Sequence, residues 1–481
     1  GSYSASEEGF YLTDADTIRF CTAPATGSSC FIIQCGSAVS IPTPGDGTVS
    51  AAKIASGAVT TAKIADANVT AAKIASGADF TFNSVSVGKG ANSVAGNTVV
   101  GESALDAAVT GGSNTAIGKN TLTANTSGAE NVAIGASGLA ANTTGGDNVA
   151  IGVEALTTNT TGSDNVAVGK NALKLSTTPS NNTAVGNAAL AATTTGHRNT
   201  AVGNEALNAN TTATNNTAVG DRALKANTTG TANTAVGNSA LTATTTGSYN
   251  TGVGTFALDA NTEGQYNSAL GYATLSANTT GDYNTAVGLT ALENATTADN
   301  NTGIGYAALN ANTTGYGNTA VGKSALEANT TGHSNVAVGY NSLDANTTGE
   351  QNTSVGYQSL SKNTTAAENT ACGYNALIET TTGSNNTAVG RAALTLNTTG
   401  TGNTAVGKDA LLSNTTGATN VAIGRDALKA NTTASYNTAV GESALEANTT
   451  GNKNVAVGYQ ALDACTTGER NQAIGNSAFG A

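Results

Sequence analysis

From Asn97 onward the chain is built from one 17-residue unit, repeated without insertion or deletion. The aligned units read N-[TV]-A-[VI]-G-x-x-A-L-x-A-N-T-T-G-x-x, with 22 full units and an 11-residue remainder. Numbered from the first Asn, position 1 is always Asn, position 5 is always Gly, and position 9 is Leu in every full unit. Stacking requires so strict a register, because each repeat contacts only its neighbours and a slipped repeat would displace those beyond it.

Composition favours an ordered stack over a disordered chain. Aromatic residues make up 4% of the sequence and charged residues 10%, and there is no Trp or Met. A chain so poor in bulky side chains buries little apolar area per residue, so it is either disordered or stabilised by regular stacking. Disordered segments usually carry far more charge, and we therefore expect stacking.

Within the unit, the residue types favour two short strands joined by two turns over a helix. Gly at position 5 and usually at 15, and Asn at 1 and 12, separate short runs with β-branched residues at 2, 4, 13 and 14. We therefore predict an all-β fold, an elongated β-solenoid (β-roll) with one coil per unit. At ~4.8 Å between paired strands, 22 coils would make a rod of about 105 Å.

The invariant residues are expected to form ladders along the axis of the solenoid. Stacked Asn side chains can hydrogen-bond to one another, Gly permits positive φ or close backbone approach at a corner, and Leu fills the interior. In two successive units the ladder residues are Asn114, Gly118, Leu122, Asn131, Gly135 and Leu139.

The apolar residues also predict which side chains face outward. Adjacent strand residues point to opposite faces. In one unit, Val321 and Leu326 are expected inside, which places Ala320 and Ala325 outside. Position 8 is Ala, Gly, Ser or Thr throughout, and a stripe of small outer residues indicates close packing against another chain. We expect a parallel homo-oligomer; the alternative is a monomeric rod.

Four regions follow from this organisation. Residues 1–46 are not repetitive and are expected to form a capping or attachment segment with strands at 9–20 and 29–41. Residues 47–79 contain ten-residue repeats, 80–96 are expected to form a degenerate capping coil, and 97–481 form the solenoid.

Two stretches resemble known families. The unit "NTAVGxxALxANTTGxx" resembles NTAIGY-type repeats of bacteriophage tail fibres and bacterial surface proteins, and is loosely similar to "NSVAIG" coils in trimeric autotransporter adhesin heads. The "VTTAKIADxxVT" repeats within 47–79 are similar to tail-fibre stalk segments. The resemblance implies a trimeric fibre on a virion, extracellular, bound to other tail proteins and reaching toward the host surface.

Catalysis has little support in the sequence, and we expect no enzyme activity, cofactor or metal site. His197 and His333 both occupy position 16, without a fixed carboxylate or nucleophile partner. The net charge of −12 without a basic run disfavours nucleic acid as a partner. No apolar run is long enough to insert into a membrane.

Tyrosine offers one candidate binding surface. Most tyrosines in the repeats occupy position 6 or 17, so stacked coils would align them. Tyr combines a flat apolar ring with a hydroxyl, which suits contact with a host cell-surface glycan; the alternative is a structural role at the corners or between chains. The candidate glycan-contacting residues are Tyr249, Tyr266, Tyr272, Tyr283 and Tyr306.

Three functional classes remain open. The first is the shaft of a phage tail fibre, which the "AKIA" repeats favour. The second is a bacterial surface adhesin or extracellular structural filament, located at the cell surface. The third is an ice-binding solenoid, in which paired threonines such as Thr143 and Thr144 would form a hydroxyl array. The third needs a flat face, but adjacent strand residues point in opposite directions.

Overall fold

The computed structural model has two units, Gly1–Ser76 and Gly77–Ala481. It describes residues 10–12, 18–20, 26 and 79–479. In the first unit, β1 (Phe10–Leu12) pairs with β2 (Ile18–Phe20) as an antiparallel hairpin, within the predicted strand region 9–20. The expected strand at 29–41 and the ten-residue repeats up to residue 78 lie outside the described residues.

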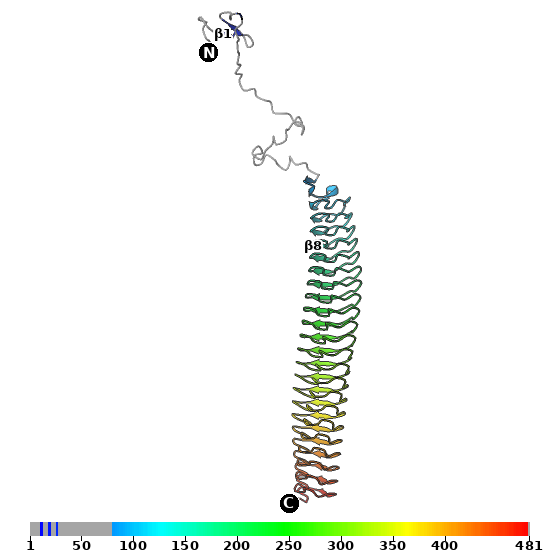
Figure 1. Cartoon of the computed structure of the whole chain (residues 1–481), viewed down its shortest axis with the longest axis vertical. Coiled ribbons are helices and arrows are strands. Elements are labelled where there is room, and N and C mark those ends of the chain that lie inside the picture. Colours follow the sequence, from blue (N-terminus) through cyan, green and yellow to red (C-terminus); the bar gives the residue numbers. More distant parts are fainter. Residues whose placement is uncertain (1–9, 13–17, 21–25, 27–78, 480–481) are drawn as a thin grey trace. The chain divides into compact units, whose positions relative to one another are not determined.

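The second unit is a parallel β-solenoid with one coil per repeat unit (Figure 1). Strands from successive units pair in parallel and in register, so that Thr319 faces Val336 and Val321 faces Val338. No α-helix occurs in the described part of the chain. The predicted all-β solenoid, with its coils spaced by one repeat unit, is therefore confirmed.

The parallel strands occupy positions 2–4 of each unit. They are β5 Thr98–Gly101, β6 Thr115–Ile117, β7 Val132–Ile134, β8 Val149–Ile151, β9 Val166–Val168, β10 Thr183–Val185, β11 Thr200–Val202, β12 Thr217–Val219, β13 Thr234–Val236, β14 Thr251–Val253, β15 Ser268–Leu270, β16 Thr285–Val287, β17 Thr302–Ile304, β18 Thr319–Val321, β19 Val336–Val338, β20 Thr353–Val355, β21 Thr370–Cys372, β22 Thr387–Val389, β23 Thr404–Val406, β24 Val421–Ile423, β25 Thr438–Val440, β26 Val455–Val457 and β27 Gln472–Ile474.

A hairpin covers the first coil. β3 (Phe80–Phe82) and β4 (Val85–Gly88) are antiparallel, and β4 also pairs antiparallel with β5; a short 3-10 helix, η4 (Ala91–Ser93), follows. The Asp79 carboxylate accepts hydrogen bonds from the backbone N–H groups of residues 89 and 90. The segment expected to be a degenerate coil thus contains a hairpin, which covers a strand edge that would otherwise be open to further pairing.

The second strand expected in each coil is absent, and this part of the prediction is wrong. Positions 6–11 form consecutive turns because residues at positions 7 and 9 adopt left-handed backbone conformations, as at Ser324 (φ 55°) and Leu326 (φ 51°). These turns still hydrogen-bond between coils: the Ser324 N–H donates to the Tyr306 carbonyl and the Leu326 N–H to the Ser342 carbonyl, at 2.9 and 3.1 Å. The segment is regular without being extended.

The expected assignment of inner and outer residues is also wrong in part. Ala320, Ala325 and Leu326 are all fully buried, while Val321 lies on the outside. The strand turns position 3 inward and positions 2 and 4 outward, and the left-handed residues of the turn segment let positions 8 and 9 both face inward. The small residues of position 8 therefore fill the narrow core beside Leu and form no outer stripe, which removes the premise behind the predicted packing of position 8 against another chain.

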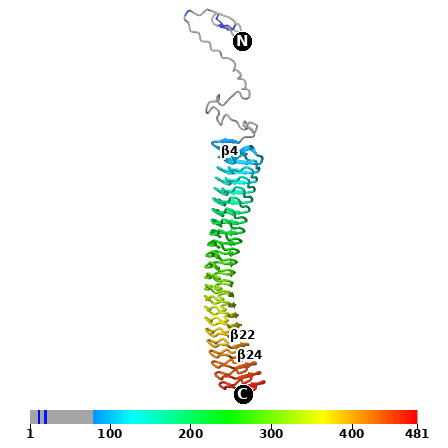
Figure 2. The ribbon, with the colours of Figure 1, turned by 90° about the vertical axis from the view of Figure 1, so that its right-hand side faces the viewer.

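The backbone of the coils is tied together along the axis. In the coil that contains Val336, position 2 donates its N–H to Asn352 of the next coil, and Gly339 donates to Val321 of the preceding one, both at 2.8 Å. The same bonds recur from coil to coil. The solenoid that these bonds hold together is a gently curved rod, as Figure 2 shows.

Glycine at position 5 is required by both conformation and space. Gly322 has φ 136°, and a Cβ there would lie 2.4 Å from the carbonyl oxygen of Gly339 in the next coil. Such an approach to backbone has no flexible side chain to move aside. The invariant Gly is therefore explained by the tight stacking of corners.

Candidate functional site: the side-chain columns of the solenoid

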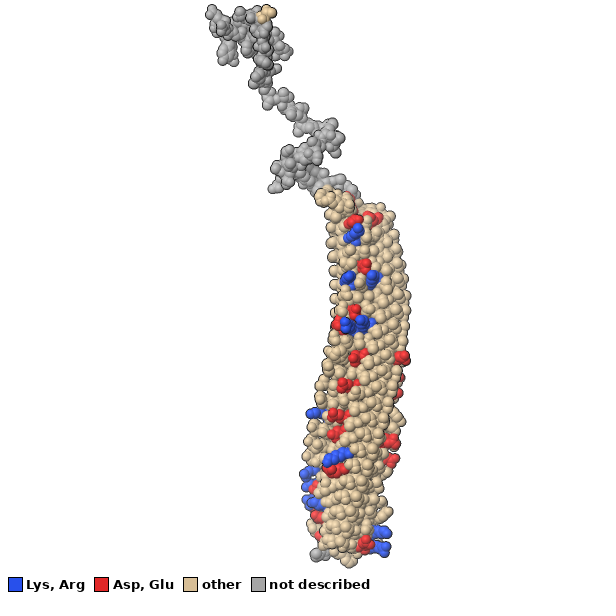
Figure 3. Space-filling view, viewed as in Figure 1, with Lys and Arg blue, Asp and Glu red and all other residues tan. Residues whose placement is uncertain are grey.

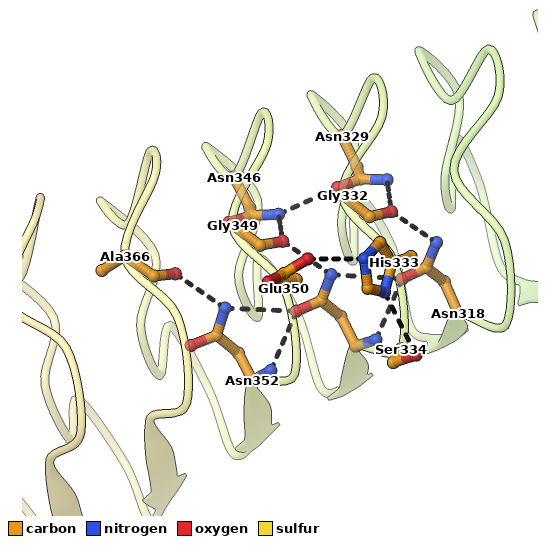
Figure 4. Close-up of polar contacts among 11 residues, drawn as sticks. Asn318, Asn329, Gly332, His333, Ser334, Asn346, Gly349, Glu350, Asn352 and Ala366 are labelled. Atoms are coloured by element: carbon orange, nitrogen blue, oxygen red, sulfur yellow. Dashed lines mark hydrogen bonds and ion pairs between the residues drawn. The ribbon is translucent and has the colours of Figure 1, made fainter.

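Stacking places the side chains of one unit position in a column along the rod. Two columns are buried Asn ladders (Figure 4). In the position-1 ladder, Asn335 Nδ2 donates to Asn318 Oδ1 at 3.2 Å; in the position-12 ladder, Asn346 Nδ2 donates to Asn329 Oδ1 at 2.8 Å. Asn335 and Asn346 both donate to the carbonyl of Gly349, at 2.9 and 3.0 Å, so this carbonyl joins the two ladders.

The six ladder residues chosen from the sequence lie together in adjacent coils. Asn131 Nδ2 donates to Asn114 Oδ1 at 3.1 Å, and both side chains are fully buried, as are Leu122 and Leu139. Gly118 has φ 129°, and a Cβ there would lie 2.8 Å from the Gly135 carbonyl group. These residues are structural in this arrangement, because the Asn and Leu side chains are buried and the two glycines have no side chain.

The position-12 ladder is interrupted wherever Asn is replaced. The Asn before each interruption keeps a buried Oδ1 that has no hydrogen-bond donor among the described residues. These residues are Asn159, Asn227, Asn278, Asn363 and Asn448. In the coil after each of them, position 12 holds Ser176, Thr244, Ala295, Thr380 and Cys465, respectively. The ladder is thus a chain of bonds in which each Asn needs the next.

Three of the candidate tyrosines form one stack at position 17. The rings of Tyr249 and Tyr266 lie 4.9 Å apart, those of Tyr266 and Tyr283 5.0 Å apart, and both pairs are parallel within 1°. Each ring covers the face of its neighbour, so mainly edges and hydroxyl groups remain exposed. Sugar rings usually contact an aromatic face, and this stack offers such faces only at its two ends.

The other two candidates lie in the position-6 column, so the five tyrosines do not form a single site. Tyr272 meets Phe256 edge-on at 6.0 Å. Further along, Lys323 Nζ lies between the rings of Tyr306 and Tyr340, at 5.7 and 5.6 Å from their centroids. This cation–π contact continues into a stack that the sequence reading left out of the candidate set, in which Tyr357 lies between Tyr340 and Tyr374.

His333 has partners that the sequence reading did not find. Its Nε2 lies 2.5 Å from Glu350 and its Nδ1 3.3 Å from Ser334 Oγ (Figure 4). Its ring also stacks on Tyr316, with 4.7 Å between the ring centroids. The expectation that this histidine has no fixed carboxylate partner is therefore wrong. Glu350 occupies position 16 of the next coil, so a search for pairs separated by one repeat unit would have found it.

Ser334, His333 and Glu350 follow the order of a nucleophile, base and carboxylate, but the surroundings do not suit acyl transfer. The side chains of His333 and Glu350 are 27% and 43% exposed, where water weakens the orienting ion pair. The Ser334 N–H, which could otherwise stabilise an oxyanion, donates to the Tyr316 carbonyl at 3.0 Å. The cluster is best described as a link between coils.

Two carboxyls in the position-10 column have raised pKa values. Burial, with a smaller contribution from the neighbouring carboxylate of Glu327, raises the pKa of Asp344 to about 6, although hydrogen bonds from the backbone N–H groups of residues 344 and 345 act to lower it. Burial likewise raises the pKa of Asp259 in the same column. Among the residues that the structure describes, no group of three His, Cys, Asp or Glu side chains is arranged to hold a metal ion.

The outer face of the parallel sheet is free of charge along its whole length. Position 2 carries Thr, Val, Ser or Gln, and position 4 carries Val, Ile, Leu or Cys. Ile304 and Val389 in the position-4 column are 38% and 37% exposed. We call these two columns the T-x-V face. Figure 3 shows the charged side chains gathered in rows along the rod, with broad uncharged surface between them. The sequence reading missed this face because it placed position 4 inside.

Comparisons with family models, curated proteins and solved structures returned no match. Within the described ranges, no helix has the length and apolar character needed to cross a membrane.

Proposed function

We propose that this chain is the structural shaft of a bacteriophage tail fibre, exposed on the virion and extending toward the host surface. The observation that carries the proposal is the uninterrupted solenoid, in which the same inter-coil backbone hydrogen bonds and the position-1 Asn ladder recur from β5 to β27. A coil that contacts only its neighbours gives length and stiffness without a large core. Length and stiffness are what a shaft requires.

The stalk-like repeats within 47–79 support a phage origin over a bacterial one. The partners proposed on the same resemblance are two further copies of this chain, in a homotrimer, and other virion tail proteins. The trimer rests on this resemblance alone, since the small residues of position 8 are buried and cannot supply an interface.

The ice-binding alternative loses its original support. The Thr143 hydroxyl donates to the Thr160 carbonyl at 2.9 Å, and the same bond recurs at position 13 in most other coils. Thr144 at position 14 is exposed, so the paired threonines present one free hydroxyl per coil and no double array. A test of the purified protein for thermal hysteresis would detect ice binding directly.

Immunogold labelling tests the proposed location. Antibodies raised against the solenoid should label tail fibres of phage particles and should block adsorption of those particles to host cells. Labelling of intact, uninfected bacterial cells, with none on particles, would contradict the phage shaft and favour a bacterial surface filament.

A further inference from the structure

The T-x-V face is an uncharged surface that runs the length of the solenoid, apolar along position 4 and with Thr methyl and hydroxyl groups along most of position 2. A strand of three residues at ~3.3 Å each is about 10 Å wide, and over a rod of about 105 Å the face covers roughly 1,000 Å². Single exposed apolar residues are ordinary, but a contiguous patch above a few hundred Å² usually marks an interaction site. Two such faces in contact would bury about 2,000 Å², which is in the range of stable protein complexes.

Charge indicates what can cover this face. Each copy carries a net charge of −12, so copies brought together through charged surfaces would repel one another. Positions 2 and 4 contain no Asp, Glu, Lys or Arg in any unit. A second copy of this chain can therefore approach over the T-x-V face without burying an unpaired charge, which would be costly.

The charges that flank the face are compatible with one relative orientation. The strand is bordered by position 17 on one side and position 6 on the other. Consider copies that are parallel and in register, related by rotation about an axis that runs along the rod. Position 6 of one copy then lies beside position 17 of the neighbouring copy. The two residues come from the same repeat unit, or the position-17 residue comes from the preceding unit. These neighbours never carry like charges, and they carry opposite charges as Lys119 and Glu130, Asp164 and Lys170, and Glu442 and Lys453.

We infer that the T-x-V face is the surface through which copies of this chain associate, parallel and in register. The inference deepens the self-assembly in the proposed function, on which it rests, and assigns the interface to positions 2 and 4. It also accounts for the β-branched residues at position 4, which the core of a single chain does not use. The face of one copy then supplies the cover that the neighbouring copy lacks.

Charge substitutions in the full chain test the face. In Ile304→Asp combined with Val389→Asp, carboxylates would be buried at the interface, and the molar mass in solution should fall from a multiple of 46.8 kDa to 46.8 kDa. The matched control is Thr314→Asp with Thr399→Asp, which changes exposed position-14 residues of the same two coils and should keep the multiple. Circular dichroism identifies any variant that has lost its fold.

Cys372 provides a test of register that needs no charge substitution. It occupies position 4 and is exposed, so in a parallel, in-register assembly the Cys372 side chains of different copies converge. With every other cysteine replaced by Ser, mild oxidation should give covalent dimers on denaturing gels. Moving the thiol to position 14 of the same coil, with Cys372→Val and Thr382→Cys, should abolish them.

The outcomes of these experiments distinguish the T-x-V interface, the oligomer and the phage shaft from one another. A multiple mass that the face substitutions leave unchanged, or oxidation that links Thr382→Cys as readily as Cys372, overturns the T-x-V interface and leaves a self-assembling shaft in place. A monomeric wild-type chain overturns both the interface and the proposed oligomer. Labelling of phage fibres tests the shaft itself and is independent of either result.

Discussion

At the scale of single residues, the solenoid depends on backbone conformations that most side chains avoid. Leu326 has φ 51°, and its equivalents share this left-handed conformation. The conformation costs about 1–2 kcal/mol per residue, and full burial of a Leu side chain returns about 1.5–3 kcal/mol. Leu at position 9 therefore offsets its own backbone strain, and the inter-coil hydrogen bonds add to what remains.

The corner Gly gives a matched pair of substitutions. Gly322→Ala should destabilise the protein strongly, because its Cβ would lie 2.4 Å from a backbone oxygen at φ 136°. Gly317 has a left-handed φ of 64°, but an added Cβ would lie 3.9 Å from its nearest neighbour, Ser334 Oγ. Gly317→Ala should therefore lower the free energy of unfolding by only about 1 kcal/mol. Thermal unfolding of the two variants checks this, and equal losses would contradict the proposed crowding of the corner.

Asp344 predicts a pH dependence of stability with a definite sign. Its ordinary pKa of 3.8 is raised to about 6 in the folded chain. Between these values the folded state holds a proton that the unfolded state has released, so stability falls as pH rises through this window. The Asp344→Asn variant should therefore melt at a higher temperature than the wild type at pH 7, and this advantage should be smaller at pH 4. A difference that is the same at both pH values would contradict the raised pKa.

At the scale of the coil, the two Asn ladders are the polar counterpart of the Leu core. Asn278 keeps an unpaired, buried Oδ1 because position 12 of the next coil is Ala295. On the other side of the gap, Asn312 Nδ2 donates only to the Gly315 carbonyl within its own coil. The interruption at Ala295 therefore leaves hydrogen-bonding capacity unused on both sides.

Filling this gap should stabilise the protein. In Ala295→Asn, the new amide can donate to Asn278 Oδ1 and accept from Asn312, and each hydrogen bond contributes about 1 kcal/mol. Ala295→Leu has the same branched shape and number of side-chain heavy atoms without the amide, and serves as the control. Chemical denaturation should show a gain for Asn and none for Leu; a gain in both would mean that volume, not the ladder, limits stability at this site.

The tyrosine stack separates a structural from a binding role. Tyr266→Phe combined with Tyr283→Phe removes two hydroxyl groups and keeps the stacked rings, so the melting temperature should hardly change. Because edges and hydroxyls are the exposed parts of this stack, binding to the host surface should weaken if the column contacts a glycan as proposed. Binding that is unchanged would exclude this role, and the stack would then serve only to join coils.

Much of the coil could be read from the sequence, and the limits have a physical cause. The strict repeat period predicted the register and the position-1 Asn ladder, because identical residues at a fixed spacing are brought one above another when the coils stack. The same reading placed Ala320 outside and Val321 inside, since strand alternation alone does not say which face is inner. The sequence-based interpretation also applied strand alternation to positions 6–11. In this segment Ser324 and Leu326 have left-handed backbone conformations, which a Leu in the sequence gives no reason to expect.

The contacts within the surface columns were harder to predict from the sequence, because they join residues that lie a full repeat unit apart. The contact between His333 and Glu350, and the position of Lys323 between two tyrosines, follow directly once the units are aligned in columns. The T-x-V face required in addition the inner and outer assignment that the structure corrected. Its lack of charge is visible in the sequence, but its exposure is not.

At the scale of the whole solenoid, stability is expected to be close to a sum over coils and their interfaces. Coils can therefore be removed in whole units without changing the others. Deletion of residues 301–385 removes five complete units and should leave the flanking coils in register. Deletion of a segment that is not a whole number of units would instead displace every ladder on one side of the junction.

Small-angle scattering of this five-unit deletion and the full chain tests the central claim most directly. At ~4.8 Å per coil, the maximum dimension should shorten by about 24 Å, while the radius of the rod's cross-section stays the same. A deletion that reduced the cross-section, or left the length unchanged, would contradict a rod built from one coil per repeat unit.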